Sequence, residues 1–155
     1  MNEAPPVIGF LGTGLMATPM IRRLLGAGYT VHVWNRTAAK AQTLIDAGAV
    51  AAATPRALAH AVDIVLMCVM DADAVDATVF GANGLTSGLT SGLATTPLRA
   101  KILVDHSSIK PEATRRFAQQ LKSATGIDWI DAPVSGGVAG AVAGSLAIKI
   151  GRAHV

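Results

Sequence analysis

The chain has 155 residues, of which 51% are hydrophobic and only 4% aromatic, and its formal net charge is +3. This length suits one domain with a sizeable aliphatic core. The basic residues are dispersed except for Arg22-Arg23 and Arg115-Arg116, which lie on predicted helices, so we expect no nucleic-acid partner. Cys68 is the only cysteine and lies in an apolar run, which predicts a core residue. No metal site is predicted.

The N-terminal segment MNEAPPV lacks the basic and then apolar pattern of a secretory signal. No apolar stretch is long enough to span a bilayer without a charge or a proline. We therefore expect a cytoplasmic protein that has no membrane partner.

A glycine-containing turn near the N-terminus joins a short apolar run to a helical pattern. Val7–Leu11 predicts a buried strand, Leu15–Gly26 a helix and Tyr29–Trp34 a second strand. Gly12 can adopt backbone angles that a side chain would forbid, and Gly14 lets the main chain approach a pyrophosphate closely. The N–H groups at the start of the helix would face that anion. The pattern indicates dinucleotide binding; the alternative is a structural turn in another α/β domain.

The second strand is followed by Asn35, Arg36 and Thr37, about twenty residues after the turn, where the adenosine ribose would lie. NAD-selecting sites usually place an acid there, and this chain has none. Arg36 offers a guanidinium group suited to a 2′-phosphate, and its two neighbours can donate hydrogen bonds. A polar helix cap with a solvated arginine is the alternative, and both can hold at once. We expect NADP(H) to be preferred, with NAD(H) possible.

The remaining pattern alternates strands and helices. Further helices are predicted over Thr37–Ala47, Pro55–His60, a segment ending at Phe80, and Pro111–Thr125. Further strands are predicted over Ala49–Ala53, 64–70, Lys101–Asp105, Asp128–Ala132 and Leu146–Ile150, and residues 81–97 form a turn-rich loop. This order predicts an α/β, Rossmann-like, doubly wound and mainly parallel sheet, whose ligands bind at the carboxyl ends of the strands.

Four segments, GFLGTGLMATPM, VWNRT, VDHSSIKPEATR and DAPVSGGVAGAVAGSLAI, resemble the N-terminal cofactor domain of the β-hydroxyacid dehydrogenase family. That family includes 3-hydroxyisobutyrate dehydrogenase and the tartronate and succinic semialdehyde reductases. The resemblance implies that the diphosphate contacts Gly12, Gly14, Leu15 and Met16 and that the 2′-phosphate contacts Asn35, Arg36 and Thr37. It places Val69 and Met70 along the ribose or nicotinamide, and Ser107 near the nicotinamide.

The resemblance also assigns a substrate site to the segment after the last long strand. Ser135, Gly136 and Gly137 would hold the carboxylate of a small acid and the neighbouring oxygen. A hydroxyl beside two glycine N–H groups is also a plausible anion cradle on physical grounds. The alternative is a glycine-rich turn that enters a closely packed helix.

The family's catalytic lysine lies in a glycine-rich motif on a long helix beyond the cofactor domain, and no lysine of this chain lies in such a motif. We therefore expect no catalytic residue within the chain, and a truncated enzyme with a cofactor domain over residues 1–151. Residues 152–155 do not resemble the family, and we interpret them as a non-native tail. An all-helical C-terminal domain and a homo-oligomer are expected for the full-length enzyme.

The function that follows is an NADP-dependent oxidoreductase acting on a small β-hydroxy acid or semialdehyde acid. Two alternatives stay open. One is an imine reductase-like enzyme, whose N-terminal region has a similar glycine turn, although the DAPVSGG segment favours an acid substrate. The other is a non-catalytic NADPH-binding module.

Overall fold

The computed structural model describes residues 4–88 and 97–151. Residues 89–96 of the predicted loop at 81–97 and the tail at 152–155 therefore lie outside the described residues. The main sheet has six strands in the order β3-β2-β1-β4-β5-β6, and every neighbouring pair is parallel. Its strands are β1 (Ile8–Leu11), β2 (Val31–Trp34), β3 (Val50–Ala51), β4 (Ile64–Met67), β5 (Ile102–Asp105) and β6 (Asp128–Asp131). This order confirms the predicted doubly wound α/β fold.

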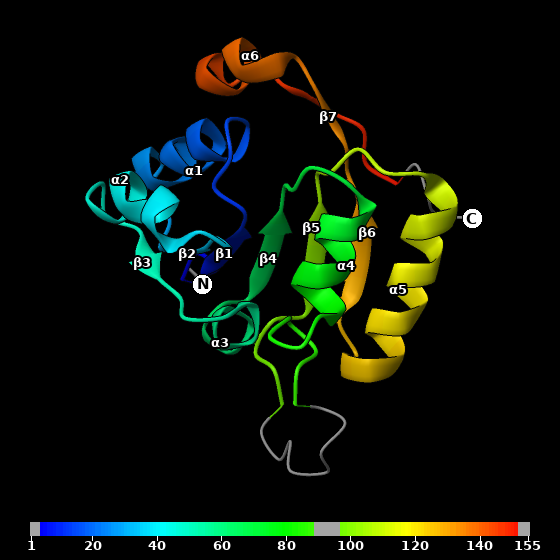
Figure 1. Cartoon of the computed structure of the whole chain (residues 1–155). Coiled ribbons are helices and arrows are strands. Elements are labelled where there is room, and N and C mark those ends of the chain that lie inside the picture. Colours follow the sequence, from blue (N-terminus) through cyan, green and yellow to red (C-terminus); the bar gives the residue numbers. More distant parts are fainter. Residues whose placement is uncertain (1–3, 89–96, 152–155) are drawn as a thin grey trace.

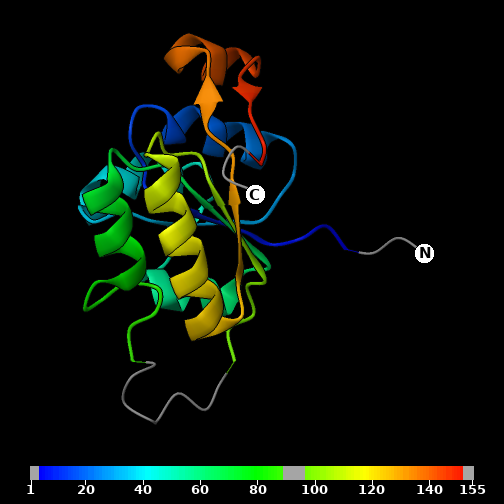
Figure 2. The same ribbon diagram turned by 90° about the vertical axis from the view of Figure 1, so that its right-hand side faces the viewer.

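Helices cover both faces of the sheet (Figures 1 and 2). They are α1 (Ala17–Gly26), α2 (Gln42–Ile45), α3 (Pro55–Ala61), α4 (Ala72–Phe80), α5 (Pro111–Thr125) and α6 (Gly137–Ala143), with a 3-10 helix η1 (Ala38–Ala41) before α2. Side chains alternate across each strand, so Phe10 and Leu11 of β1 enter different clusters. Phe10 packs with α1 and α2, whereas Leu11 packs with the residues of α3, α4 and α5. The core is mainly aliphatic, as the composition predicts.

Most of the predicted helices begin and end as their capping residues indicate. The Thr54 hydroxyl accepts from the Ala57 amide at 3.0 Å, and Asp71 Oδ1 accepts from the Ala74 amide at 2.8 Å. Gly126 ends α5 in the left-handed conformation, with φ 78°. Local sequence chemistry therefore positions α3, α4 and α5.

The single helix predicted over Thr37–Ala47 is wrong in detail. Residues 38–41 form η1 and residues 42–45 a separate single turn, and the Thr37 side chain makes no capping hydrogen bond among the described residues. The segment buries little apolar surface, because only Ala41 and Leu44 of these two elements are buried. With so small an apolar face, packing does not hold the segment to a continuous helix.

A second, two-stranded antiparallel sheet follows β6. It pairs β7 (Val134–Ser135) with β8 (Ala147–Ile148), and α6 lies between these strands in the chain. The predicted final strand at Leu146–Ile150 is therefore shorter than expected and lies outside the main sheet. Figure 2 shows this hairpin and α6 rising beyond the carboxyl ends of the main strands, where α6 lies beside α1.

The described residues contain no helix that is both long and apolar enough to cross a membrane. Within the same residues, no group of three or more His, Cys, Asp or Glu side chains could hold a metal ion.

Candidate dinucleotide-binding site

The carboxyl ends of the main strands meet at one edge of the sheet, which we call the carboxyl rim. It consists of residues 12–16 after β1, 35–37 after β2, 68–71 after β4, 106–108 after β5 and 132–137 after β6. Backbone hydrogen bonds continue past the strand ends. The Gly12 amide donates to Trp34 O at 2.9 Å, and the His106 amide donates to Met67 O at 2.8 Å. The loops that begin here are therefore held in register before any ligand arrives.

Glycine is present at the two positions of the first turn for different structural reasons. Gly12 has φ 95°, and a Cβ there would lie 2.5 Å from Cys68 O, so no other residue fits without a backbone shift. A Cβ on Gly14 would meet nothing within 4 Å. Gly14 therefore borders open space, which is the room that a diphosphate would need.

The start of α1 faces that space, and no side chain of the described residues neutralises the positive end of its helix dipole. Met16 is the N-cap residue, and no side chain among the described residues caps the helix there. The first turn contains no acidic residue. The Thr18 amide donates to Gly14 O at 2.9 Å. The helix start still carries partial positive charge, so this end fits an anion.

Asn35 lies between the glycine turn and the loop after β2. Its Oδ1 accepts from the Thr13 amide at 3.0 Å, and its Nδ2 donates to Thr37 O at 2.9 Å. The side chain therefore ties the two loops together and keeps one further N–H for a ligand. Arg36 and Thr37 are exposed beside it.

The remaining predicted cofactor residues differ in exposure. Leu15 and Met70 are large apolar side chains that are 83% and 88% exposed, although both lie at the centre of the rim. Val69 and Met16 are half-buried. Ser107 is buried, and its Oγ accepts from the Val69 amide at 3.0 Å. Exposed apolar side chains at a rim are available to cover the flat faces of a bound ring.

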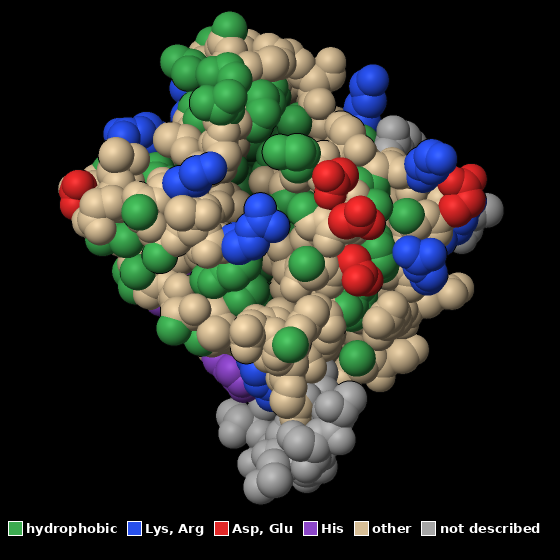
Figure 3. Space-filling view, viewed as in Figure 1, with side chains coloured by type: hydrophobic (Ala, Val, Ile, Leu, Met, Phe, Trp, Pro, Cys, Tyr) green, Lys and Arg blue, Asp and Glu red, His purple; other side chains and the backbone are tan. Residues whose placement is uncertain are grey.

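The predicted substrate segment lies at the base of α6. Ser135, Gly136 and Gly137 are all exposed. The two glycines have φ of 135° and 63°, which L side chains rarely adopt. A Cβ on Gly136 would also approach Leu146 Cδ2 to 3.1 Å. The glycine pair is thus required by the turn itself. Figure 3 shows apolar side chains gathered over α6, where Val138 and Val142 are exposed.

Two buried acids at the rim were missed by sequence reasoning. Asp105 ends β5, Asp131 ends β6, and the two residues are directly paired in the sheet register. They are 0% and 2% exposed. Asp105 Oδ1 accepts from the Ser107 amide at 2.9 Å. An acid that ends an otherwise apolar strand is the sequence signal that could have identified Asp105.

Burial dominates the electrostatics of this cluster. It raises the pKa of Asp105 to about 6; the hydrogen bonds from Ser107 act against that change, and the Asp131 charge adds to it. Burial likewise raises the pKa of the Cys68 thiol to about 11, so the thiol stays protonated. It lowers the pKa of His106, whose ring Nδ1 lies 2.7 Å from Ala132 O and donates to it.

Comparison with known proteins identifies the family of this chain. Residues 7–154 match the family model of the NAD-binding domain of 6-phosphogluconate dehydrogenase. The 2-hydroxy-3-oxopropionate reductase of Escherichia coli is 41% identical over 144 residues, which are 93% of this chain and 46% of that enzyme. The solved structure of Psf3 in complex with NADP+ and 2-OPP is 35% identical, with a TM-score of 0.79 over 93% of this chain and 48% of that one.

A third relative is the Mycobacterium tuberculosis 3-hydroxyisobutyrate dehydrogenase with L-serine. It is 28% identical, with a TM-score of 0.77 over 96% of this chain and 47% of that one. The chain therefore belongs to this NAD-binding domain family, as a cofactor domain of the β-hydroxyacid dehydrogenases. It spans about half the length of these relatives.

Proposed function

We propose that this chain is the NADP-binding part of an oxidoreductase that acts on a small β-hydroxy acid or semialdehyde acid. The observation that carries the proposal is the uncapped start of α1 beside the open space over Gly14. The bound nicotinamide would accept or supply the hydride. The chain's own residues bind the diphosphate at α1, order the loops through Asn35, and present apolar side chains at the rim.

Selection of NADP(H) over NAD(H) is assigned to Arg36. It is exposed at the end of β2, in a segment without an acid, so its guanidinium can reach a 2′-phosphate. Cofactor titrations followed by NAD(P)H fluorescence test this. The unaltered chain should bind NADPH more tightly than NADH. Arg36→Ala should remove most of the preference, since a charge-assisted contact contributes about 1.5–3 kcal/mol. Arg22→Ala, an exposed arginine on α1, is the matched control. Equal or tighter binding of NADH by the unaltered chain would contradict the assignment.

The substrate carboxylate is assigned to Ser135 and the amides of Gly136 and Gly137. Their exposure at the rim and the acid-acting relatives support this assignment. Ser135→Ala in the full-length protein should weaken acid substrates and leave NADPH affinity nearly unchanged. Loss of cofactor affinity instead would place this segment in the cofactor site.

The proton on the substrate oxygen requires an acid or base. We propose that a lysine outside residues 1–155 supplies it, within a helical domain of a homo-oligomeric enzyme. NADPH-consumption assays with succinic semialdehyde, tartronate semialdehyde and glyoxylate test the proposal. Turnover should require the longer protein. Ordinary turnover by residues 1–155 alone would show that the catalytic group lies inside them. Cofactor binding without turnover by the longer protein would favour the non-catalytic module, and turnover of imines alone would favour the imine reductase.

A further inference from the structure

The loop after β4 is held by the loop after β5 through side chains inside the protein. The Val69 amide donates to Ser107 Oγ at 3.0 Å, and the Ser107 amide donates to Asp105 Oδ1 at 2.9 Å. Ser107 is 1% exposed and Asp105 is fully buried, so water does not compete for these bonds.

This arrangement changes what Ser107 can do. Its hydroxyl oxygen already accepts a hydrogen bond from the Val69 amide, and its own amide donates to Asp105 Oδ1. A buried hydroxyl whose oxygen is already hydrogen-bonded inside the protein is poorly placed to bind a ligand directly. Its effect on a ligand would instead pass through Val69 and the neighbouring Met70, which is exposed at the rim.

We propose that Asp105 is a positioning residue for the cofactor: its carboxylate holds Ser107, and Ser107 holds the Val69–Met70 backbone in the arrangement that receives the nicotinamide end. This inference rests on the proposed function, because it assumes a cofactor at the carboxyl rim. It assigns Asp105 a role that the glycine motif and the Arg36 segment do not cover.

The placement of Asp105 supports a functional reason for the acid. A carboxylate buried beside a second acid, Asp131, is an unfavourable group for stability alone. Its Oδ2 has no hydrogen-bond partner among the described residues. Buried ionisable groups with perturbed titration are typical of functional sites. A charged acceptor also binds an amide more strongly than a neutral one, which is what a positioning contact requires.

The titratable groups near Asp105 are Asp131 on β6, Cys68 after β4, and the adjacent His106. The Cys68 thiol remains protonated between pH 5 and 8 because its pKa is about 11. Burial disfavours the charged form of His106. The charge that changes between pH 5 and 8 is therefore mainly that of Asp105.

The test is NADPH affinity between pH 5 and 8, measured by fluorescence. At pH 8, Asp105→Asn should bind about fivefold more weakly than the unaltered protein, because a neutral acceptor replaces a charged one. The difference should disappear near pH 5, where the native carboxyl is itself protonated. Ser107→Ala should bind about tenfold more weakly at every pH, because the Val69 amide loses its acceptor.

Two matched controls separate this effect from general ones. Asp73→Asn makes the same charge change on the exposed first turn of α4, and Ser123→Ala removes an exposed hydroxyl on α5. Both should stay within about twofold of the unaltered protein at every pH. The cofactor's 2′-phosphate also titrates in this range, and Asp73→Asn shows that contribution alone. Equal affinity of Asp105→Asn and the unaltered protein at pH 8 would overturn the inference.

A second measurement is independent of the cofactor. Hydrogen exchange of the Val69 amide, measured without ligand, should accelerate in both Asp105→Asn and Ser107→Ala but not in the controls. Unchanged exchange in both variants would also overturn the inference. If the unaltered protein binds no NADPH, the proposed function fails, whereas accelerated exchange would still show that Asp105 positions Val69.

Discussion

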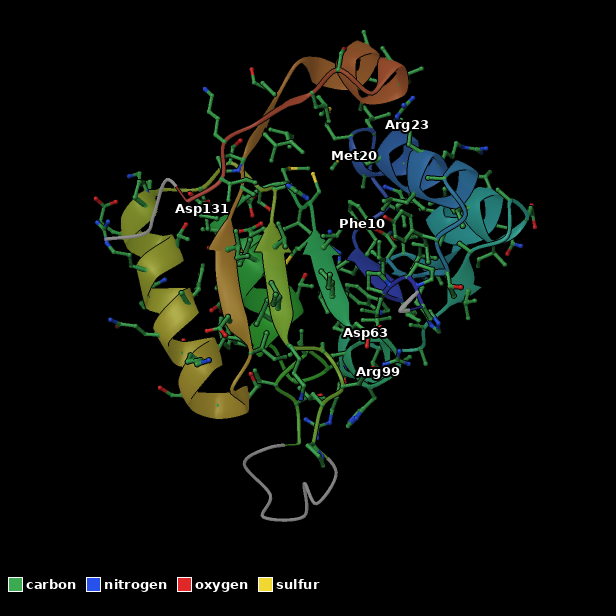
Figure 4. All side chains as sticks on the ribbon, turned by 180° about the vertical axis from the view of Figure 1, so that it is seen from behind. Phe10, Met20, Arg23, Asp63, Arg99 and Asp131 are labelled. Atoms are coloured by element: carbon green, nitrogen blue, oxygen red, sulfur yellow. The ribbon has the colours of Figure 1, made fainter. Side chains whose placement is uncertain are left out.

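The two ends of the main sheet use their charged groups in opposite ways (Figure 4). At the amino end, Asp63 receives two hydrogen bonds from Arg99, at 2.8 and 2.9 Å, and one from the Val7 amide at 2.8 Å. These partners lower the pKa of Asp63. At the carboxyl end, burial raises the pKa of Asp105, and its nearest acid is another aspartate. At the amino end, the charge of Asp63 is balanced by its partners and stabilises the fold. At the carboxyl end, the charge of Asp105 is unfavourable for folding and lies where a ligand is expected.

The largest expected effect distinguishes the two glycines of the rim. Gly12→Ala should lower the free energy of unfolding by about 3 kcal/mol or more, because a Cβ would clash with Cys68 O in a left-handed backbone conformation. Gly14→Ala meets no atom within 4 Å and should leave stability nearly unchanged while weakening NADPH binding. Urea unfolding and cofactor titration of both variants give the comparison. A Gly14→Ala variant with native cofactor affinity would contradict the diphosphate assignment.

The next effect concerns the charge of Asp105. Its folded pKa, about 6, exceeds the ordinary value of 3.8, so this group favours folding below pH 3.8, and that contribution is lost as pH rises through 6. The difference corresponds to about 3 kcal/mol. Asp105→Asn should therefore be more stable than the unaltered protein by up to about 3 kcal/mol at pH 8, with little difference at pH 4. Urea unfolding at both pH values measures it. An equal gain in stability at the two pH values would show that the buried charge of Asp105 is not its cause.

The smallest effect on stability is expected for a substitution of Asp63 at the amino end of the main sheet. Asp63 has a lowered pKa, so its contribution to stability is present above pH 3.8 and is lost as pH falls through the folded value. Asp63→Asn should lower Tm at pH 7, and added salt should narrow the difference, because both partners are partly exposed. Glu112→Gln, which removes a looser contact with Arg115 at 3.8 Å, is the control and should change Tm less. No change in Asp63→Asn would show that the pair is not stabilising.

Features that depend on local chemistry were predicted from sequence. The glycine turn, the cap at Thr54 and the apolar runs can be recognised in the sequence because each depends on a few adjacent residues. The alternation of strands and helices then predicts a parallel, doubly wound sheet, whereas the strand order is known only from the structure. These sequence features together predict the fold and the edge of the sheet at which the site is expected.

Features that depend on distant packing were not predicted. The break in the helix after Thr37 reflects how little apolar surface its residues bury, and the pairing of β7 with β8 joins segments separated by α6. The bond from Val69 to Ser107 spans 38 residues, so no local pattern indicates it. That each predicted site residue contacts a cofactor stays a prediction; the structure shows which of these residues face solvent and which are buried.

The position of β1 between β2 and β4 also affects how the chain forms during synthesis. Ile8 pairs with Val31 on one side and with Ile64 on the other, so the second partner lies 56 residues further along the chain. At about 5–20 residues per second, a ribosome needs roughly 3–11 s to add them. Over that interval one edge of β1 has no strand to pair with, so the nascent chain exposes the unpaired edge of an apolar strand. Such an edge can bind chaperones or neighbouring chains.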